Sequence, residues 1–405
     1  MKVKKYIFED VFKYFEVLGA AGEKNRYLKF TEFNFFTRLF ISLFSKIEIY
    51  RLRKNKKNLP TIFFYSDPII HNYIFNYIIT FTKLIINNPF RGQIGKNKFN
   101  HKIYSITISL INESLIKGFN SNNDKMISSA LRQLGILIKK TKIELIVITD
   151  SISPINRALI YIGRKLKIKT IEIQHAIYVS KMPLITGLGP DFVFVWGEFF
   201  KNMYLKQKIR TSNSIKILGY PFEITKKKKN SFDSKLKLYY LAQGFHLQDI
   251  KNLDILLNNA IKLKEICDKN NINFKCRLHP NSPKILLDKI LPKVECTPFD
   301  EKIEDAIDNG DIFVSFNSTA LIQASLQGKN CIQLKNIPVV TDDFEELGIC
   351  PSFNNLNDLS KYIDELDKSN ILKNYKEISK SYIKTSNEGS GKIFLNLVNE
   401  VLQNN

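Results

Sequence analysis

Two polar segments in the last third of this 405-residue chain carry residue types suited to binding an anion. His279-Pro280 follows the apolar run 274–278, and Asn317-Ser318-Thr319 follows the apolar run 312–316. A helical pattern begins after the second segment. The N–H groups at a helix start, with hydroxyls and an imidazole beside them, hold a phosphate well. We therefore predict a donor-phosphate site made of these residues.

Two further candidates for catalysis follow strand-like runs earlier in the chain. Asp150 closes the run 143–150, and His175 follows the run IEIQ. Direct displacement at a sugar carbon needs a base on the attacking hydroxyl and stabilisation of the leaving phosphate. We predict Asp150 and His175 as catalytic residues. For Asp150 the alternative is a cap for the helix expected to start near Pro154.

Arg277 and Gly244 complete the predicted donor-binding set. Arg277 lies two residues before His279, and its alternative role is a structural pair with a carboxylate. Gln243-Gly244 ends another strand-like run and either approaches the donor phosphate or simply turns the chain. We find no acidic pair of the DxD type at a strand end, so we expect no metal and no cofactor.

The elements that position these residues alternate between strand and helix. Expected strands cover 143–150, 169–178, 191–197 and 214–221, and a second series begins at 237. This rhythm is typical of parallel sheets covered on both faces, in which the carboxyl ends of strands share one edge. Upstream, 59–67 is expected to be a strand, and the stretch that follows it to about residue 87 is expected to be helical.

The domain organisation follows from a break in this rhythm at a run of four lysines. We predict an N-terminal α/β domain over 1–222 on the acceptor side and a Lys-rich linker over 223–235. A nucleotide-sugar-binding α/β domain is predicted over 236–385, with a terminal helix over 386–405. The fold class is α/β, with two doubly wound domains facing a cleft.

Composition limits the classes of partner. The formal net charge of +22 indicates an acidic partner, although the Lys, Ile and Asn enrichment also fits a genome-wide bias. The lysines are dispersed and no nucleic-acid-binding module is visible, so we expect no nucleic acid. Segment 35–58 is either an amphipathic helix on an anionic inner-leaflet surface or an ordinary packed helix. No signal peptide or membrane span is seen, which predicts a cytoplasmic protein able to attach peripherally to the inner membrane. The five cysteines lack CxxC spacing, so disulfides and structural zinc are not expected.

RLHP together with SFNSTALIQASLQGK resembles the HP and Ser/Thr motifs of bacterial sialyltransferases and polysialyltransferases. The run from TDSISPINRAL to IEIQHAIY, with PDFVFVWG and ILGYP, is similar to the amino-terminal half of surface-polysaccharide transferases. Together these similarities cover roughly residues 140 to 400. They imply the GT-B architecture and imply that His279, Ser318 and Thr319 hold the donor phosphate. This chain departs from the family at two positions. Asp150 is not followed by the Gly of the acidic motif of sialyltransferases, and Ala176 stands where related sequences have Gly.

This resemblance implies an inverting, metal-independent glycosyltransferase. The expected donor is CMP-activated sialic acid or a related nonulosonate. The expected acceptor is a cell-surface glycan such as capsule or lipopolysaccharide, or a lipid-linked oligosaccharide. The alternatives are a transferase that uses a UDP-sugar or CDP-polyol donor, and a sugar epimerase on the same architecture.

Overall fold

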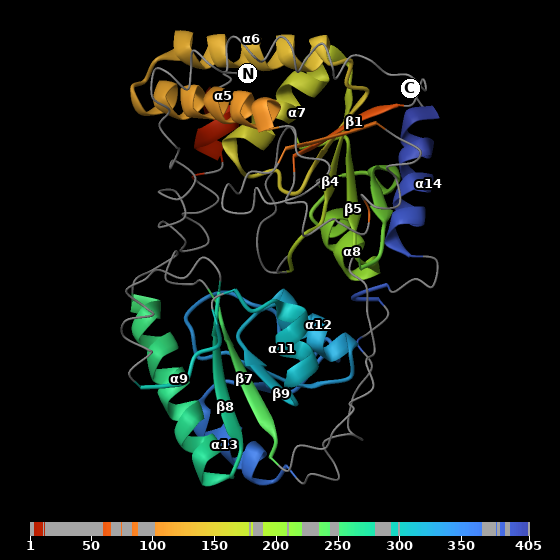
Figure 1. Cartoon of the computed structure of the whole chain (residues 1–405). Helices are drawn as coiled ribbons and strands as arrows, with labels where there is room; N and C mark the ends of the chain where they lie inside the picture. The colour runs from red at the N-terminus through yellow and green to blue at the C-terminus, as the bar shows by residue number, and fades with distance from the viewer. Residues whose placement is uncertain are drawn as a thin grey trace.

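The computed structural model describes residues 4–10, 12, 60–65, 74, 83–87, 102–177, 180, 189–208, 210–220, 235–243, 251–279, 293–298, 300–366, 378, 381–384 and 389–403. Pro280, Gly244, the segment 35–58 and nearly all of the predicted linker lie outside these residues. The described chain forms two halves, each built on a parallel sheet (Figure 1).

The first sheet has the strand order β2-β1-β3-β4-β5-β6, and every neighbouring pair is parallel. Its strands are β1 (Thr61–Tyr65), β2 (Lys83–Asn87), β3 (Leu145–Ile148), β4 (Lys169–Ile173), β5 (Phe192–Val195) and β6 (Ile215–Ile217). The helices are α5 (Lys102–Asn120), α6 (Asp124–Lys140), α7 (Pro154–Leu166) and α8 (Glu198–Lys206), with the short η1 (Lys5–Glu9) and η3 (Ser212–Ser214). Side chains of η1, α5, α6 and α7 share one buried core with this sheet.

One sequence prediction about this half is wrong. The stretch expected to be helical up to about residue 87 ends in the strand β2, which pairs in parallel with β1 from Lys83 opposite Thr61 to Asn87 opposite Tyr65. The run Leu-Ile-Ile in β2 is rich in β-branched residues, and pairing with a buried neighbour favours a strand for such a run.

The second sheet has the order β11-β10-β9-β7-β8 and is also parallel. Its strands are β7 (Lys237–Ala242), β8 (Asn273–Leu278), β9 (Ile312–Ser315), β10 (Asn330–Leu334) and β11 (Ser352–Phe353). The helices are α9 (Lys251–Lys269), α11 (Ile303–Asn309), α12 (Thr319–Leu326) and α13 (Leu356–Asp364). Residues of α9 and α13 pack in one core on this sheet, and residues of α11 and α12 belong to another.

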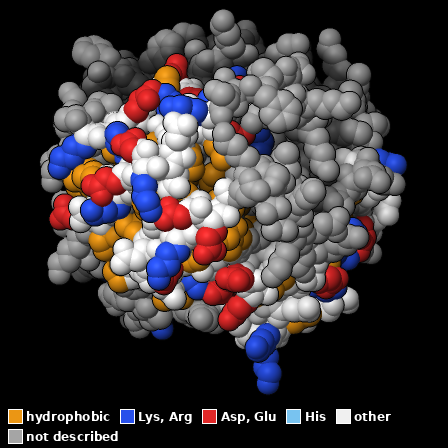
Figure 2. Space-filling model, turned by 90° about the horizontal axis from the view of Figure 1, so that it is seen from below, with side chains coloured by type: hydrophobic (Ala, Val, Ile, Leu, Met, Phe, Trp, Pro, Cys, Tyr) orange, Lys and Arg blue, Asp and Glu red, His pale blue; other side chains and the backbone are white. Residues whose placement is uncertain are grey.

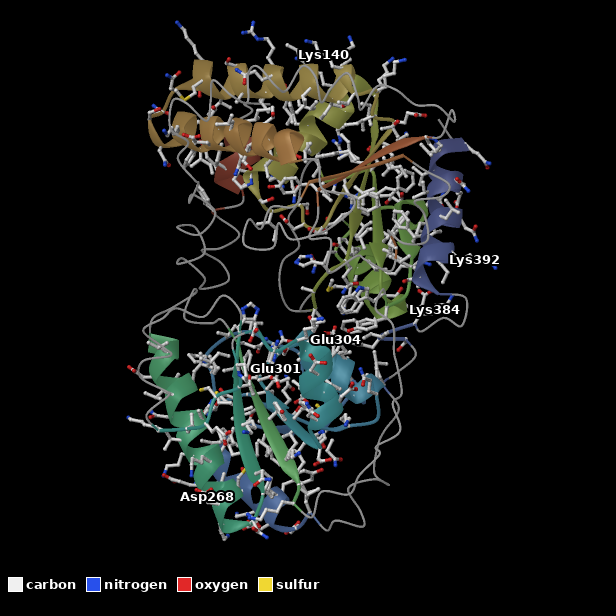
Figure 3. The ribbon with its side chains drawn as sticks, viewed as in Figure 1. Lys140, Asp268, Glu301, Glu304, Lys384 and Lys392 are labelled. Atoms are coloured by element: carbon white, nitrogen blue, oxygen red, sulfur yellow. The ribbon has the colours of Figure 1, made fainter. Side chains whose placement is uncertain are left out.

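The end of the chain returns to the first half. Lys384 donates its backbone N–H to Trp196, and its carbonyl accepts from Tyr220 (2.8 and 2.9 Å). Figure 3 places Lys384 at the lower end of the first half. The last helix, α14 (Ser390–Gln403), then packs Phe394, Val398 and Val401 into the core of the first sheet. A separate core cluster contains buried residues of both halves, among them Trp196 and Leu321, so apolar packing joins the halves.

Candidate functional site

The polar strand ends of the second half lie along one edge of its sheet. Gln243 follows β7, His279 follows β8, and Asn317 lies just past β9. The sequence does not reveal that β7 separates β8 from β9. Since parallel strands lie about 4.8 Å apart, the two motif-bearing strands are about 10 Å apart. The connection after β7 leads to β8 on one side, whereas the connection after β9 leads to β10 on the other, and ligands bind at such a switch point in doubly wound folds.

Gln243 bridges this switch point. Its side-chain carbonyl accepts a hydrogen bond from the Asn317 N–H at 2.7 Å, and its amide nitrogen donates to the Asn317 carbonyl. Ser315 adds a second link between the strands, from its hydroxyl to the carbonyl of Leu241 at 2.9 Å. The side-chain oxygen of Asn317 is buried and has no hydrogen-bond partner. The loop before α12 is therefore held rigidly from β7, and it carries a buried acceptor.

Ser318 and Thr319 open the helix α12. Ser318 is its N-cap, with extended backbone angles and a side chain that accepts from the Ala320 N–H at 3.2 Å. Thr319 is the first helical residue. Ser318 therefore caps this helix. Capping and anion binding are compatible, because both use the unpaired N–H groups of the first turn.

His279 is exposed just past the end of β8, whereas the side chain of Arg277 is half-buried and contacts Glu301. The guanidinium of Arg277 donates from Nη2 to the Glu301 carbonyl at 2.9 Å, and its Nε lies 3.9 Å from a carboxylate oxygen of Glu301. Burial lowers the pKa of Arg277, and Glu301 partly offsets that change. Arg277 therefore makes the structural pair foreseen as its alternative role. Glu301 lies at the upper end of the second half in Figure 3.

Asp150 in the first half lies before the N-cap of α7, which is Ser153, so it does not cap that helix. One carboxylate oxygen accepts from the N–H groups of Ile152 and Ser153 at 2.9 and 2.7 Å, and the other accepts from the side chain of Asn156 at 2.8 Å. These contacts fix the turn that leads into α7. Burial raises the pKa of the Tyr65 hydroxyl, and the Asp150 carboxylate raises it further, since β1 and β3 are neighbours.

His175 is half-buried at the end of β4, and its tautomer follows from its contact. Its Nδ1 lies 2.5 Å from the carbonyl oxygen of Thr149. A carbonyl only accepts, so Nδ1 carries a proton, and in the neutral ring Nε2 is the nitrogen that holds the lone pair. Thr149 adjoins Asp150, so the fold brings both predicted catalytic residues to one edge. Of the two, His175 has the chemistry of a base.

The carboxyl edges of the two sheets meet at Ser180 and Asp342. The backbone N–H of Ser180 donates to both carboxylate oxygens of Asp342, at 3.0 and 3.2 Å, and its hydroxyl donates as well. Ser180 follows His175 on the first sheet, and Asp342 follows β10 on the second. The loops bearing the base candidate and the phosphate-site candidates therefore project toward the same interdomain space.

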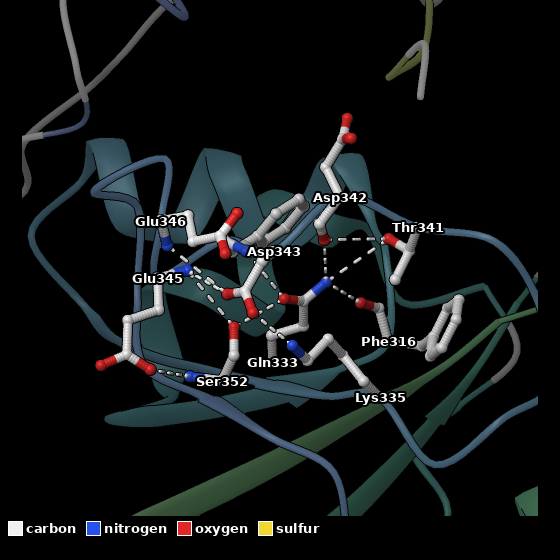
Figure 4. A network of polar contacts seen from close by, with 10 residues as sticks. Phe316, Gln333, Lys335, Thr341, Asp342, Asp343, Glu345, Glu346 and Ser352 are labelled. Carbon is white, nitrogen blue, oxygen red and sulfur yellow. Dashed lines mark hydrogen bonds and ion pairs between the residues drawn. The ribbon is translucent and has the colours of Figure 1, made fainter. Parts of the chain in front are cut away.

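Gln333, near the end of β10, holds the Asp342 loop in place (Figure 4). It is fully buried, donates to the carbonyls of Phe316 and Asp342, and accepts from the Phe344 N–H and the Ser352 hydroxyl. Because Phe316 directly precedes Asn317, Gln333 also supports the phosphate-site loop. Sequence reasoning missed this residue, although a lone Gln inside a buried strand signals an internal network.

Comparison with solved structures shows what these two halves form. The UDP-GlcNAc 2-epimerase of Methanocaldococcus jannaschii in complex with UDP-GlcNAc and UDP matches with a TM-score of 0.58 and 16% identity, over 84% of this chain and 99% of that one. The chain has the GT-B fold. The UDP-GlcNAc 2-epimerase of Neisseria meningitidis matches with a TM-score of 0.55 and 15% identity, over 85% and 99%.

The wall teichoic acid polymerase TagF shares the GT-B fold with this chain as well. It matches with a TM-score of 0.51 and 12% identity, over 91% of this chain and 98% of that one. At the level of sequence, no protein-family model matches the chain, and no curated protein does. The comparisons therefore establish the fold.

Two observations bear on the partners expected from composition. Seen from below, the described surface intersperses Lys and Arg with Asp and Glu and shows no continuous basic field (Figure 2). Within the described residues, no helix is long and apolar enough to cross a membrane.

Proposed function

We propose that this chain is a glycosyltransferase that uses a nucleotide-activated sugar. The donor phosphate binds at the Asn317-Ser318-Thr319 turn, with His279 on the far side of β7. One observation carries the proposal: Gln243 rigidly presents this turn at the switch point of the second sheet. Preorganised N–H groups and hydroxyls at that position stabilise the negative charge that develops on a leaving nucleotide.

The reaction step is proposed to take place where the carboxyl edges of the two sheets meet. The acceptor hydroxyl attacks the anomeric carbon as the bond from that carbon to the phosphate oxygen breaks. Its proton passes to Nε2 of His175, which the Thr149 carbonyl orients from the other side of the ring. The phosphate leaves with the bonding electrons. Attack from the face opposite the leaving group inverts the anomeric centre, and in this scheme no metal is required.

The finer substrate assignment rests on sequence. The HP and Ser/Thr motifs support a CMP-activated nonulosonate donor and a cell-surface glycan acceptor, and the charge of +22 supports docking on an anionic inner leaflet near lipid-linked acceptors. A UDP-sugar donor is the strongest alternative, because two solved structures that share the fold with this chain over 99% of their own length are UDP-GlcNAc 2-epimerases. A CDP-polyol donor remains in the same class.

The second candidate function is a nucleotide-sugar epimerase. The coverage of 99% of the Methanocaldococcus jannaschii epimerase favours it. An epimerase converts the sugar without an acceptor, whereas a transferase needs one. Product analysis with and without an acceptor glycan separates the two functions.

Nucleotide binding provides the first test. Purified protein is heated with CMP, CDP, UDP or GDP, because a ligand that binds the folded state raises the melting temperature by mass action. We expect one nucleotide to shift the melting temperature and the corresponding activated sugar to release it in the presence of acceptor. If no nucleotide produces a shift and none is released from any donor, the proposed function is wrong.

A further inference from the structure

Two cysteines beside the proposed donor site are direct neighbours on adjacent backbone segments. Cys276 lies in β8 and forms a parallel bridge with Cys296, which lies in the segment 293–298. The Cys276 N–H donates to the Glu295 carbonyl, and the Thr297 N–H donates to the Cys276 carbonyl, both at 2.9 Å. Directly paired residues lie about 4.8 Å apart, which is within the roughly 4.4–6.8 Å between Cα atoms that a disulfide spans.

The two thiols also contact each other. The interaction between the two side chains lowers the pKa of Cys296 and raises that of the fully buried Cys276. Thiolate is the reactive form of cysteine, and Cys296 is the partly exposed member of the pair, which solvent reaches.

The other cysteines lie in different surroundings. The described residues include all five cysteines, and Cys296 is half-buried whereas the other four are buried. Burial raises the pKa of Cys267 to about 12 and raises those of Cys331 and Cys350 as well. Cys331 donates its thiol to the carbonyl of Leu321 at 3.3 Å. An oxidant from solution therefore meets Cys296 first.

Neighbouring contacts fix the two segments in register around the pair. Lys275 forms an ion pair with Glu295 on one side, and Arg277 contacts Glu301 on the other. The backbone pairing therefore holds the two cysteines next to each other before any oxidation. A second thiol is already in place when the first is oxidised.

We propose that Cys276 and Cys296 form a thiol pair that peroxide converts to a reversible disulfide. The Cys296 thiolate attacks one oxygen of hydrogen peroxide, the O–O bond breaks, and hydroxide leaves with sulfenic acid on Cys296. The Cys276 sulfur then attacks the Cys296 sulfur, the S–O bond breaks, and water leaves after the Cys276 proton is taken up. Two thiols and one peroxide give one disulfide and two waters.

The disulfide would tie 293–298 covalently to β8, three residues before the exposed His279. This modification site is independent of the proposed activity, because it rests on the two thiols alone. Its test uses the full chain and does not require a substrate.

Reduced protein is treated with hydrogen peroxide and analysed by intact mass and by non-reducing peptide mapping. We expect loss of two hydrogens, a Cys276–Cys296 cross-linked peptide, and full reversal by a phosphine reductant. The Cys276→Ser variant should stop at a sulfenic acid on Cys296 that a dione reagent traps. The Cys331→Ser variant, which removes a buried thiol outside the pair, should form the disulfide like the unaltered chain.

Three outcomes would overturn the proposal. They are oxygen addition to Cys296 without a cross-link in the unaltered chain, a disulfide that joins other cysteines, and no reaction at Cys296 under conditions that oxidise free cysteine. Thermal unfolding of each variant before oxidation checks that it is folded. Oxidation of the unaltered chain decides the question even if the Cys276→Ser variant does not fold.

Discussion

The imidazole of His175 donates a hydrogen bond from Nδ1 to the carbonyl oxygen of Thr149, at 2.5 Å. This contact joins the ends of β4 and β3 and determines which ring nitrogen can take a proton. Gln174 stiffens the same strand end, because its amide donates to the Ala176 carbonyl and accepts from the Trp196 N–H. The base candidate is therefore oriented by the backbone of its own sheet.

Replacing His175 tests that role. In His175→Asn, the amide nitrogen can still donate to the Thr149 carbonyl, but no base remains. We expect kcat to fall by about 10²- to 10⁴-fold, the usual contribution of a general base. The melting-temperature shift with nucleotide should be retained. In His279→Ala we expect weaker nucleotide binding, seen as a smaller melting-temperature shift with nucleotide. An unchanged kcat in His175→Asn would contradict the role of His175 as the base.

Ser318 and Thr319 are expected to differ in their effects on stability. Ser318→Ala removes the cap of α12 and should lower the free energy of unfolding by about 1 kcal/mol. Thr319→Val keeps the shape of the side chain and leaves the cap in place, so its effect on stability should be small. Both variants should weaken nucleotide binding, measured by titration calorimetry. Unchanged affinity in the double variant would rule out a phosphate site at this turn.

Gln333→Leu should be strongly destabilising. It leaves the Phe316 and Asp342 carbonyls, the Phe344 N–H and the Ser352 hydroxyl without this partner in a buried region. Each unsatisfied buried group costs about 1–3 kcal/mol, so we expect a loss of about 3 kcal/mol or more in denaturant unfolding. Gln327→Leu, at a half-buried position just past α12, is the matched control and should change little. Equal stability of the two variants would show that the network contributes nothing.

Two substitutions of glycine by alanine should change the stability of the protein in opposite directions. A Cβ at Gly197 would lie 2.5 Å from the Tyr382 carbonyl oxygen and 2.7 Å from that of Ser381, so Gly197→Ala should displace the returning segment and lower the melting temperature. Gly135 lies inside α6, where a Cβ meets Ile162 at an ordinary 3.7 Å. Gly135→Ala should stabilise the chain by about 0.5–1 kcal/mol. A neutral Gly197→Ala would contradict the tight approach.

The sequence predicts much of the fold because periodic patterns and strand-end residues are local signals. The strands from 143 to 221 and the helix that starts near Ser318 and Thr319 were found in this way. The position of β7 between β8 and β9 was not found, because the spatial order of strands depends on where crossovers pack. β2 was missed because a short apolar run fits a helix or a strand until a partner strand is known.

The interpretation of single polar residues was limited by the same lack of partners. The capping alternative placed Asp150 near the start of α7, which is a local feature of the sequence, but the N-cap is Ser153 and Asp150 binds the turn before it. Arg277 could not be paired with Glu301 from sequence, since the contact joins separate segments. Gln333 escaped notice for the same reason: its four partners are spread from Phe316 to Ser352.

The covering of the first sheet by Phe394, Val398 and Val401 bears on how the protein is made. During translation, one face of that sheet stays uncovered until α14 has been made, after its own strands and after the whole second half. A nascent chain stalled after β6 would expose apolar side chains such as Ile62, Val147 and Phe194 to the cellular milieu. Premature stop codons within the final helix should therefore yield an aggregating product, although every residue of the proposed site has already been translated.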